Sequence, residues 1–228
     1  MKQLAVAIDG PSGAGKSTVA RAAAQKLGFV YVDTGALYRA IGWYAKEKGI
    51  ALEDCQPVCR LLPEIKLRLL YDERGQRVLV NGRDVSEEIR TPEMSRYASA
   101  VSALAPVRQF LLQTQRDIAR EHAVIMDGRD IGTVILPDAQ VKIFLTASPE
   151  KRAERRYLEW KEKGLAVDRD SVLQELMRRD ENDTRREQAP LRSAEDAVVL
   201  DTSELTLEES VERVVALVRA AMEGERNG

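Results

Sequence analysis

A lysine and a serine end a glycine-rich segment near the start of the chain, a combination suited to holding phosphate. The segment reads GPSGAGKS from Gly10 to Ser17 and fits the pattern G-x-x-x-x-G-K-[ST] of a phosphate-binding loop. In such a loop the glycines let backbone N–H groups converge on phosphate oxygens, and the helix that follows adds partial positive charge. Lys16 would reach the β- and γ-phosphates, and the Ser17 hydroxyl would bind Mg²⁺.

The segment therefore predicts nucleotide binding. The predicted contact residues are Gly10, Pro11, Ser12, Gly13, Ala14, Gly15, Lys16, Ser17 and Thr18. The alternative is a glycine-rich turn between a strand and a helix, with Lys16 in solvent. Because switch GTPases, motor ATPases and small-molecule kinases share this loop, the reaction depends on a second anion site.

The segment DTGALYR, from Asp33 to Arg39, is one candidate for that site. It follows a second apolar run, and ligands of open α/β sheets bind beyond the carboxyl ends of the strands. Thr34 and Arg39 would flank the start of a helix, which suits a monophosphate. The alternative is that Thr34 only caps this helix.

The segment DGRDIG, from Asp127 to Gly132, is a second candidate and follows another apolar run. Two aspartates and an arginine at the end of a buried strand are costly unless they act on a ligand or pair with each other. Arg129 and Asp130 are the candidate functional residues. The alternative is a simple Asp127–Arg129 ion pair.

A third cluster is RRDENDTRR, from Arg178 to Arg186, on a predicted helix. Arg179, Asp183 and Arg186 have the spacing i, i+4, i+7 and would share one helix face. Arginines that close over a phosphate suit phosphoryl transfer, because its catalysis is mostly positioning and charge neutralisation. The alternative is a surface helix held by ion pairs.

The elements that must position these motifs alternate between strand and helix, which predicts an α/β layer fold. Short apolar runs indicate strands buried in a parallel sheet. The predicted strands are Leu4–Ile8, Phe29–Asp33, Ala123–Asp127, Val141–Leu145 and Ala197–Asp201. The predicted helices are Lys16–Leu27, Ala36–Lys48, Glu93–Leu104, Pro106–Glu121, Ser148–Lys163 and Arg169–Glu187, with a last one within 205–222.

Residues 61–90 break this alternation and predict a small antiparallel insert. The strands would be Ile65–Tyr71 and Gln76–Val85, with turns at Asp72–Gly75 and at the Asn-Gly pair. The insert would therefore be a meander.

Composition limits the possible partners. The chain has 228 residues, 44% of them hydrophobic and 32% charged, with a formal net charge of −2. Such a surface does not steer a polyanion, so we expect no nucleic-acid partner. Cys55 and Cys59 are the cysteines and His122 is the histidine, too few ligands for a structural metal site, so we expect reduced, inert thiols. No apolar run is long enough for a signal peptide or a membrane span, and we expect a cytoplasmic protein.

Several pieces of the chain together resemble the bacterial cytidylate kinases, nucleoside monophosphate kinases of the P-loop superfamily. The pieces are IDGPSGAGKST, DTGALYR, NGRDVSEEIRTPE, ASAVSALAPVR, DGRDIGTVILPDA, VKIFLTAS, RRDENDTRR and APL. The resemblance implies a three-layer α/β fold with a central parallel sheet, a small antiparallel insert and a helical lid. It also implies transfer of a phosphoryl group from ATP to CMP or dCMP with Mg²⁺, in a cytoplasmic monomer that serves pyrimidine metabolism.

The resemblance assigns a role to each candidate residue. It implies that Arg39, Arg129 and Arg186 grip phosphates, with Thr34 where the family often has serine. It implies that Ser99, Arg108 and Asp130 read the cytosine base. Arg179 and Asp183 stand where the family contacts the sugar. Taken together, the expected catalytic residues are Lys16, Arg129, Asp130, Arg179 and Arg186.

The base assignment is chemically reasonable. A carboxylate such as Asp130 accepts from the N4 amino group of cytosine, while Arg108 and Ser99 donate to N3 and O2. Uracil would present mismatched groups, and a site built for specific hydrogen bonds rejects such an analogue strongly.

The expected organisation is one domain over residues 1–228. Its core comprises about 1–60, 91–150 and 190–228; the insert is about 61–90, and the lid is about 151–189. Two alternatives remain open: a kinase of the same fold with another acceptor, such as UMP, AMP or a small hydroxy acid, or a nucleotide-dependent switch without an acceptor.

Overall fold

A computed structural model describes residues 3–72, 75–162, 164 and 166–226 of the chain. The chain divides into two compact units, each described here by itself. The first unit comprises Met1–Val30 and Ala119–Gly228, and the second comprises Tyr31–Ile118. The predicted division into core, insert and lid is a different description, and it stays a prediction.

The first unit is built on a parallel sheet. Its strands are β1 (Ala5–Asp9), β6 (Val124–Asp127), β7 (Val141–Thr146) and β8 (Val198–Asp201). The full strand order is β2-β6-β1-β7-β8, and β2 (Val30–Asp33) leads the chain into the second unit. β1 pairs with β6 and β7 in parallel, with Ile8 opposite both Asp127 and Ile143. The predicted parallel α/β sheet is confirmed.

Burial decreases from the middle of this sheet to its β8 edge. Every residue of β1 and β6 is buried, as their uninterrupted apolar sequences predict. β7 alternates between buried and half-buried positions, the pattern of a strand with one better covered face. At the edge strand β8, Val199 is 61% exposed. The central strands therefore provide the rigid frame from which the loops of the site extend.

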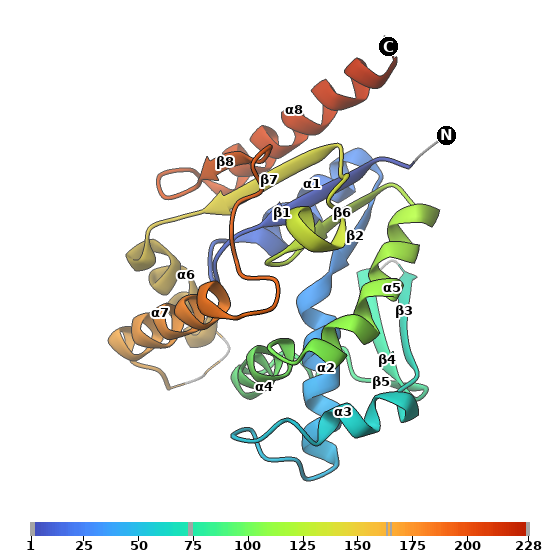
Figure 1. Ribbon diagram of the computed structural model, residues 1–228. Helices are drawn as coiled ribbons and strands as arrows, with labels where there is room; N and C mark the ends of the chain where they lie inside the picture. The colour runs from blue at the N-terminus through green and yellow to red at the C-terminus, as the bar shows by residue number, and fades with distance from the viewer. Residues whose placement is uncertain (1–2, 73–74, 163, 165, 227–228) are drawn as a thin grey trace. The chain divides into compact units, whose positions relative to one another are not determined.

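Helices surround this sheet. They are α1 (Lys16–Leu27), α6 (Pro149–Glu162), α7 (Arg169–Arg185) and α8 (Leu207–Arg226), and η2 (Ile131–Ile135) is a short π-helical turn. Helices α1 and α8 contact each other, and α6 and α7 lie side by side at one end of the sheet (Figure 1). Within the described part of the chain, every helix is too short or too polar to cross a bilayer.

The last turn of α7 corrects one prediction. The helix ends at Arg185, and Arg186 has extended backbone angles (φ −62°, ψ 140°). The physical reason is that Leu191 N–H donates to the Asp183 carbonyl at 2.8 Å, the carbonyl that would accept from residue 187 in a longer helix. The predicted end of this helix at Glu187 is therefore wrong. Arg186 is the capping residue, and its N–H still donates to the Asn182 carbonyl at 3.1 Å, so the expectation that Arg186 shares a helix face with Arg179 and Asp183 stays a prediction.

The second unit packs helices against a small sheet. Its helices are α2 (Thr34–Glu47), the short α3 (Val58–Leu61) and η1 (Leu62–Glu64), α4 (Pro92–Ser102) and α5 (Ala105–Glu121). Helix α2 packs against α4 and β4 around one apolar cluster that includes Leu37, Ile41 and Leu111. This cluster is the hydrophobic core of the unit.

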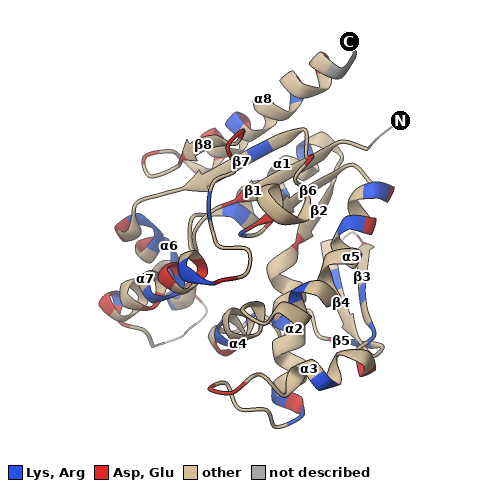
Figure 2. Ribbon diagram, in the orientation of Figure 1, with Lys and Arg blue, Asp and Glu red and all other residues tan. Residues whose placement is uncertain are grey.

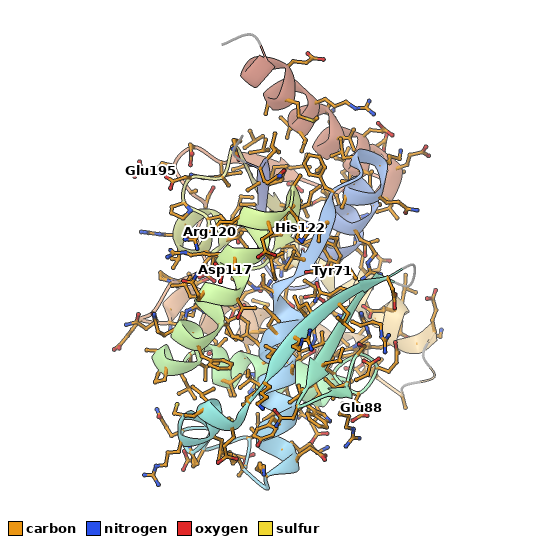
Figure 3. The ribbon with its side chains drawn as sticks, turned by 90° about the vertical axis from the view of Figure 1, so that its right-hand side faces the viewer. Tyr71, Glu88, Asp117, Arg120, His122 and Glu195 are labelled. Carbon is orange, nitrogen blue, oxygen red and sulfur yellow. The ribbon has the colours of Figure 1, made fainter. Side chains whose placement is uncertain are left out.

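The small sheet confirms the predicted meander. Its antiparallel strands β3 (Leu67–Asp72), β4 (Gly75–Val80) and β5 (Arg83–Asp84) follow in that order (Figure 3). Asn81 and Gly82, at φ 51° and 84°, form the Asn-Gly turn, because a type I′ hairpin requires positive φ at both central residues. Residues 73–74 of the other predicted turn lie outside the described residues.

The start of α2 corrects a second expectation. Asp33 caps this helix, and its side chain accepts from Ala36 N–H at 2.9 Å. Thr34 is the first residue inside the helix, so the alternative of Thr34 as the cap is wrong. A carboxylate just before the helix competes well for this position, since it also meets the partial positive charge of the helix start.

Candidate active site

The phosphate-binding loop joins β1 to α1 in the first unit. Gly10, Gly13 and Gly15 have φ values of 145°, 75° and 88°, which other residues rarely adopt. A Cβ at Gly10 would lie 2.0 Å from the Leu145 carbonyl oxygen, so close packing also requires glycine there. The loop therefore has the backbone conformation for which its sequence is suited, and it presents the first N–H groups of α1.

Lys16 is buried in this loop. It is 5% exposed, and its Nζ donates to the Pro11 carbonyl at 2.7 Å. Burial lowers the pKa of Lys16 well below its ordinary value, and the positive charges of Arg129 and Arg179 lower it further, while Asp127 and Asp9 oppose the shift. The negative charge of a phosphate bound here would favour the charged ammonium form of Lys16 and raise its pKa again.

A hydroxyl and a carboxylate meet beside the loop. Ser17 Oγ donates to Asp127 Oδ2 at 2.9 Å, which joins the start of α1 to the carboxyl end of β6. These oxygen donors fit Mg²⁺, which commonly takes one or two protein ligands and completes its shell with phosphate and water. Within the described residues, no group of three or more His, Cys, Asp or Glu side chains is placed to hold a metal by itself. The donor set therefore fits a metal that arrives with a nucleotide.

Arginines from two separate motifs converge on buried carboxylates of the first unit. Arg129 Nε donates to Asp183 Oδ2 at 2.7 Å, and Arg186 Nη2 donates to Asp130 Oδ1 at 3.1 Å. The positive charge of Arg179 also favours the ionised form of Asp183 and lowers its pKa. The structure therefore brings together DGRDIG and RRDENDTRR, and it does so even though Arg186 lies past the end of the helix.

The charges in this cluster support each other. Burial opposes ionisation of Asp183, but Arg129, Arg179 and Arg186 hold the pKa of its carboxyl below the ordinary value. Burial likewise opposes the charge of Arg129, but Asp183, Asp180 and Asp127 together raise its pKa above the ordinary value. The hydrogen bonds of these groups are Arg129 to Asp183 and Ser17 to Asp127. The charge of Asp127 also raises the pKa of Arg129, so the Asp127–Arg129 pairing stays open as an alternative.

The second unit holds the DTGALYR motif. Arg39 Nη2 donates to Asp33 Oδ2 at 2.7 Å, and Asp33 is fixed at its backbone by the Gln76 side chain, which accepts from its N–H and donates to its carbonyl. Burial opposes the charge of Asp33, but Arg39 and Ala36 N–H hold its pKa below the ordinary value. Arg39 is thus oriented by a firmly held carboxylate, and Thr34 beside it is buried.

Ser99 and Arg108 lie on successive helices of the second unit and share a neighbour. Arg108 Nη1 donates to the Ser102 carbonyl at 3.4 Å, and Ser102 Oγ donates to the Ser99 carbonyl at 3.0 Å. The Arg108 guanidinium also lies 5.7 Å from the centre of the Tyr38 ring, within cation–π range. The structure therefore groups these two predicted residues within their own unit.

Sequence reasoning missed an ion pair that holds the loop. Buried Arg152 donates to the Ser12 carbonyl at 2.9 Å and pairs with Asp180, and Asp180 Oδ1 accepts from Ser12 N–H at 3.0 Å. Both backbone groups of Ser12 are thus held by α6 and α7. Asp180 lies inside RRDENDTRR, which was a usable signal, whereas Arg152 stands in an ordinary charged helix.

A parallel sheet, a phosphate-binding loop with a buried lysine and a set of arginines with buried carboxylates define a kinase of the P-loop class. A sequence profile for the family described as Cytidylate kinase matches residues 6–220. The chain belongs to the cytidylate kinase family, and it is an enzyme whose family reaction is phosphoryl transfer to CMP or dCMP.

Curated relatives named Cytidylate kinase match along nearly their whole length. The protein from Caldicellulosiruptor saccharolyticus is 49% identical over 217 residues, 95% of this chain and 96% of that one. The protein from Carboxydothermus hydrogenoformans is 50% identical over 213 residues, 93% of this chain and 96% of that one. Among solved structures, an uncharacterized protein from Eubacterium ventriosum aligns with a TM-score of 0.53 at 12% identity, covering 95% of this chain and 99% of that one, and it supports the fold alone.

Proposed function

We propose that the chain transfers the γ-phosphoryl group of ATP to CMP or dCMP by direct in-line displacement, giving ADP and CDP or dCDP. One set of contacts carries the assignment of residues: Ser17 of the phosphate-binding loop donates to Asp127 at 2.9 Å, and Arg129, two positions further on, donates to Asp183 at 2.7 Å. These contacts bring DGRDIG and RRDENDTRR to the loop. Burial, and then the charges of Arg129 and Arg179, lower the pKa of Lys16, and phosphates bound among these cations would favour its charged form.

Each group in the cluster has a part in the transfer. The loop N–H groups and Lys16 hold the ATP phosphates, and Arg129, Arg179 and Arg186 neutralise the charge that keeps two polyanions apart. No general base is required, because the acceptor phosphate is already an anion. Asp183 orients Arg129, and Asp130 orients Arg186, which keeps the guanidinium groups in place before the substrates arrive.

Mg²⁺ is part of this proposal. Ser17 and Asp127 would hold it, the first through its hydroxyl and the second through its carboxylate, and the ion would neutralise phosphate charge in the transfer. The roles of Thr34 and Arg39 at a phosphate and of Ser99, Arg108 and Asp130 at the base stay predictions. A monomeric state, a cytoplasmic location and the absence of a nucleic-acid partner also stay predictions.

The test is an acceptor panel with ADP release as the readout. Wild-type chain with ATP and Mg²⁺ is offered CMP, dCMP, UMP, AMP and a small hydroxy acid in separate reactions. We expect release to rise strongly with CMP and dCMP and weakly with the others. Preference for UMP, AMP or the hydroxy acid would indicate another acceptor class, and slow hydrolysis that no acceptor stimulates would indicate a switch protein.

A further inference from the structure

Asp9 is a buried carboxylate of the IDGPSGAGKST segment that has no part in the proposed transfer. It ends β1, directly before the phosphate-binding loop, and is 4% exposed. Its Oδ1 accepts from Ile131 N–H and its Oδ2 accepts from Gly132 N–H, both at 2.8 Å. Asp9 therefore holds a segment 122 residues away in the chain, the turn that follows Arg129 and Asp130.

The two N–H groups that donate to Asp9 belong to Ile131 and Gly132, the first two residues of the η2 turn. Further along this turn, Val134 and Ile135 N–H donate to the Asp130 carbonyl and Leu136 N–H donates to the Ile131 carbonyl. The N–H groups at the start of a helical turn have no partner inside it and need a cap. Such a cap is usually the side chain of the residue just before the turn, and aspartate is among the preferred residues.

Asp130 occupies that capping position, but its side chain is directed elsewhere. Within the described residues, it makes no capping hydrogen bond to η2, and its Oδ1 accepts from Arg186 Nη2 at 3.1 Å. Asp9 supplies the cap from the neighbouring strand instead. The Asp130 carboxylate is thus released from a local structural task at the very point where the family reads its substrate.

The packing around Gly132 shows how closely the turn is held. A Cβ at Gly132 would lie 3.2 Å from Lys142 Cδ and 3.4 Å from Asp9 Oδ2. A side chain at residue 132 would therefore press on Lys142 and on the capping carboxylate of Asp9. The hydrogen bonds from Ile131 and Gly132 to Asp9 are the contacts that hold the turn next to Asp130.

We propose that Asp9 is a positioning residue for the acceptor: by capping η2 from β1, it keeps the Asp130 carboxylate directed at Arg186 and at the CMP base. This inference rests on the proposed function, because it assumes that Asp130 contacts the acceptor. It assigns to Asp9 an effect on acceptor binding that is larger than its effect on ATP binding.

A buried aspartate at this position carries an electrostatic cost. Burial raises the pKa of Asp9 to about 6, and the charge of Asp130 raises it too, while the Gly132 and Ile131 N–H groups and Lys16 lower it. An uncharged residue would avoid this cost but would not accept both N–H groups. Only a carboxylate offers two acceptor oxygens, one for each of the two N–H groups, which explains why an aspartate is found here in spite of this cost.

The test is the Asp9→Asn variant in the full-length enzyme, with exposed Asp138→Asn as the matched control. An asparagine has one acceptor oxygen and would turn an NH₂ group toward the second N–H. We expect the KM for CMP to rise about tenfold, the scale of one lost hydrogen bond to a charged group, with the KM for ATP within about twofold. The preference for CMP over UMP should also narrow.

Three outcomes separate the possibilities. If the wild-type chain does not phosphorylate CMP, the proposed function fails. If it does, and Asp9→Asn leaves the KM for CMP and the CMP preference unchanged, the positioning role of Asp9 is wrong. Amide hydrogen exchange of the wild-type chain covers the case in which the variant does not fold: we expect slow exchange at Ile131 and Gly132, and exchange as fast as in exposed backbone would overturn the proposal.

Discussion

The two units of the molecule differ in the charged side chains that they bury. Among the described residues, the buried charged residues of the first unit are Asp9, Lys16, Asp127, Asp130, Arg152 and Asp183, and that of the second unit is Asp33. Both units bury apolar side chains, and those of the second unit form one large cluster between its helices and its small sheet. Figure 2 shows in addition, whatever the burial, that charged residues are frequent along α6 and α7 and rare along α2.

This difference indicates which residues should matter most for activity and which for stability. Burying a charge costs free energy unless it is paired, and a buried pair is weak evidence for stability. We therefore expect the buried charges of the first unit to serve the reaction and the apolar cluster of the second unit to serve its stability. Substitutions in the first unit should reduce activity more than stability, and substitutions in the core of the second unit should do the reverse.

The largest effect is expected at Lys16. Lys16→Met removes the ammonium group from the phosphates and should lower kcat by roughly 10² to 10³, the scale of one preorganised donor. The melting temperature should stay the same or rise, since the buried charge is removed. The control is Lys26→Met, an exposed lysine. Steady-state kinetics and thermal melts check both, and full activity of Lys16→Met would remove the loop from the mechanism.

A comparable effect on stability is expected at Leu37. This side chain of α2 is fully buried in the core of the second unit. Leu37→Ala should lower the free energy of unfolding by about 2–5 kcal/mol, through lost burial and the cavity that remains. Turnover per folded molecule should change little. Urea unfolding and active-site titration separate the two quantities, and a loss of turnover without a loss of stability would contradict the contrast between the units.

A smaller effect is expected from the ionisation of Asp9. Because the folded state raises its pKa from 3.8 to about 6, the folded chain holds this proton more tightly than the unfolded chain. The stability gained from Asp9 is then complete below about pH 4 and is lost as the pH rises to about 6. The loss is on the order of 2–3 kcal/mol.

The Asp9→Asn variant lacks this ionisation. Its free energy of unfolding, relative to that of the wild type, should therefore rise between about pH 4 and pH 6 and then level off. Denaturant unfolding at a series of pH values measures the difference. A difference that does not depend on pH would show that Asp9 does not titrate with a raised pKa.

The smallest effect is expected at an exposed ion pair of the second unit. Lys46 Nζ lies 2.6 Å from Glu93 Oε2, and both side chains are more than two-fifths exposed. Solvent and salt screen such a pair, so Lys46→Ala should leave both the melting temperature and kcat unchanged within error. A clear loss of either would mean that surface charge, and not only buried charge, matters in this molecule.

The sequence predicted what depends on neighbouring residues. The strand, the glycines and the helix around Gly10–Ser17 are local signals that agree with one another, and the resemblance covers most of the chain. The parallel sheet and the meander were predictable for the same reason. The site assignments of the second unit, Thr34 and Arg39 among them, stay predictions.

The parts that were missed or wrong depend on residues far apart in the chain. Asp9 meets Ile131 and Arg152 meets Ser12 across more than a hundred positions, and no spacing rule connects such pairs. The prediction that this helix continues to Glu187 was wrong, because Leu191 N–H donates to the Asp183 carbonyl, a contact that helix periodicity does not show. Tertiary contacts override local pattern at these points.

The proposed mechanism requires the cations around Lys16 to hold the phosphates of two nucleotides at once. Calorimetric titration with a bisubstrate analogue, in which adenosine and cytidine are joined at their 5′ positions through five phosphates, tests it most directly. We expect the analogue to bind at least about 10²-fold more tightly than ATP or CMP alone, since the second nucleotide binds intramolecularly. An affinity no higher than that of ATP alone would contradict the claim.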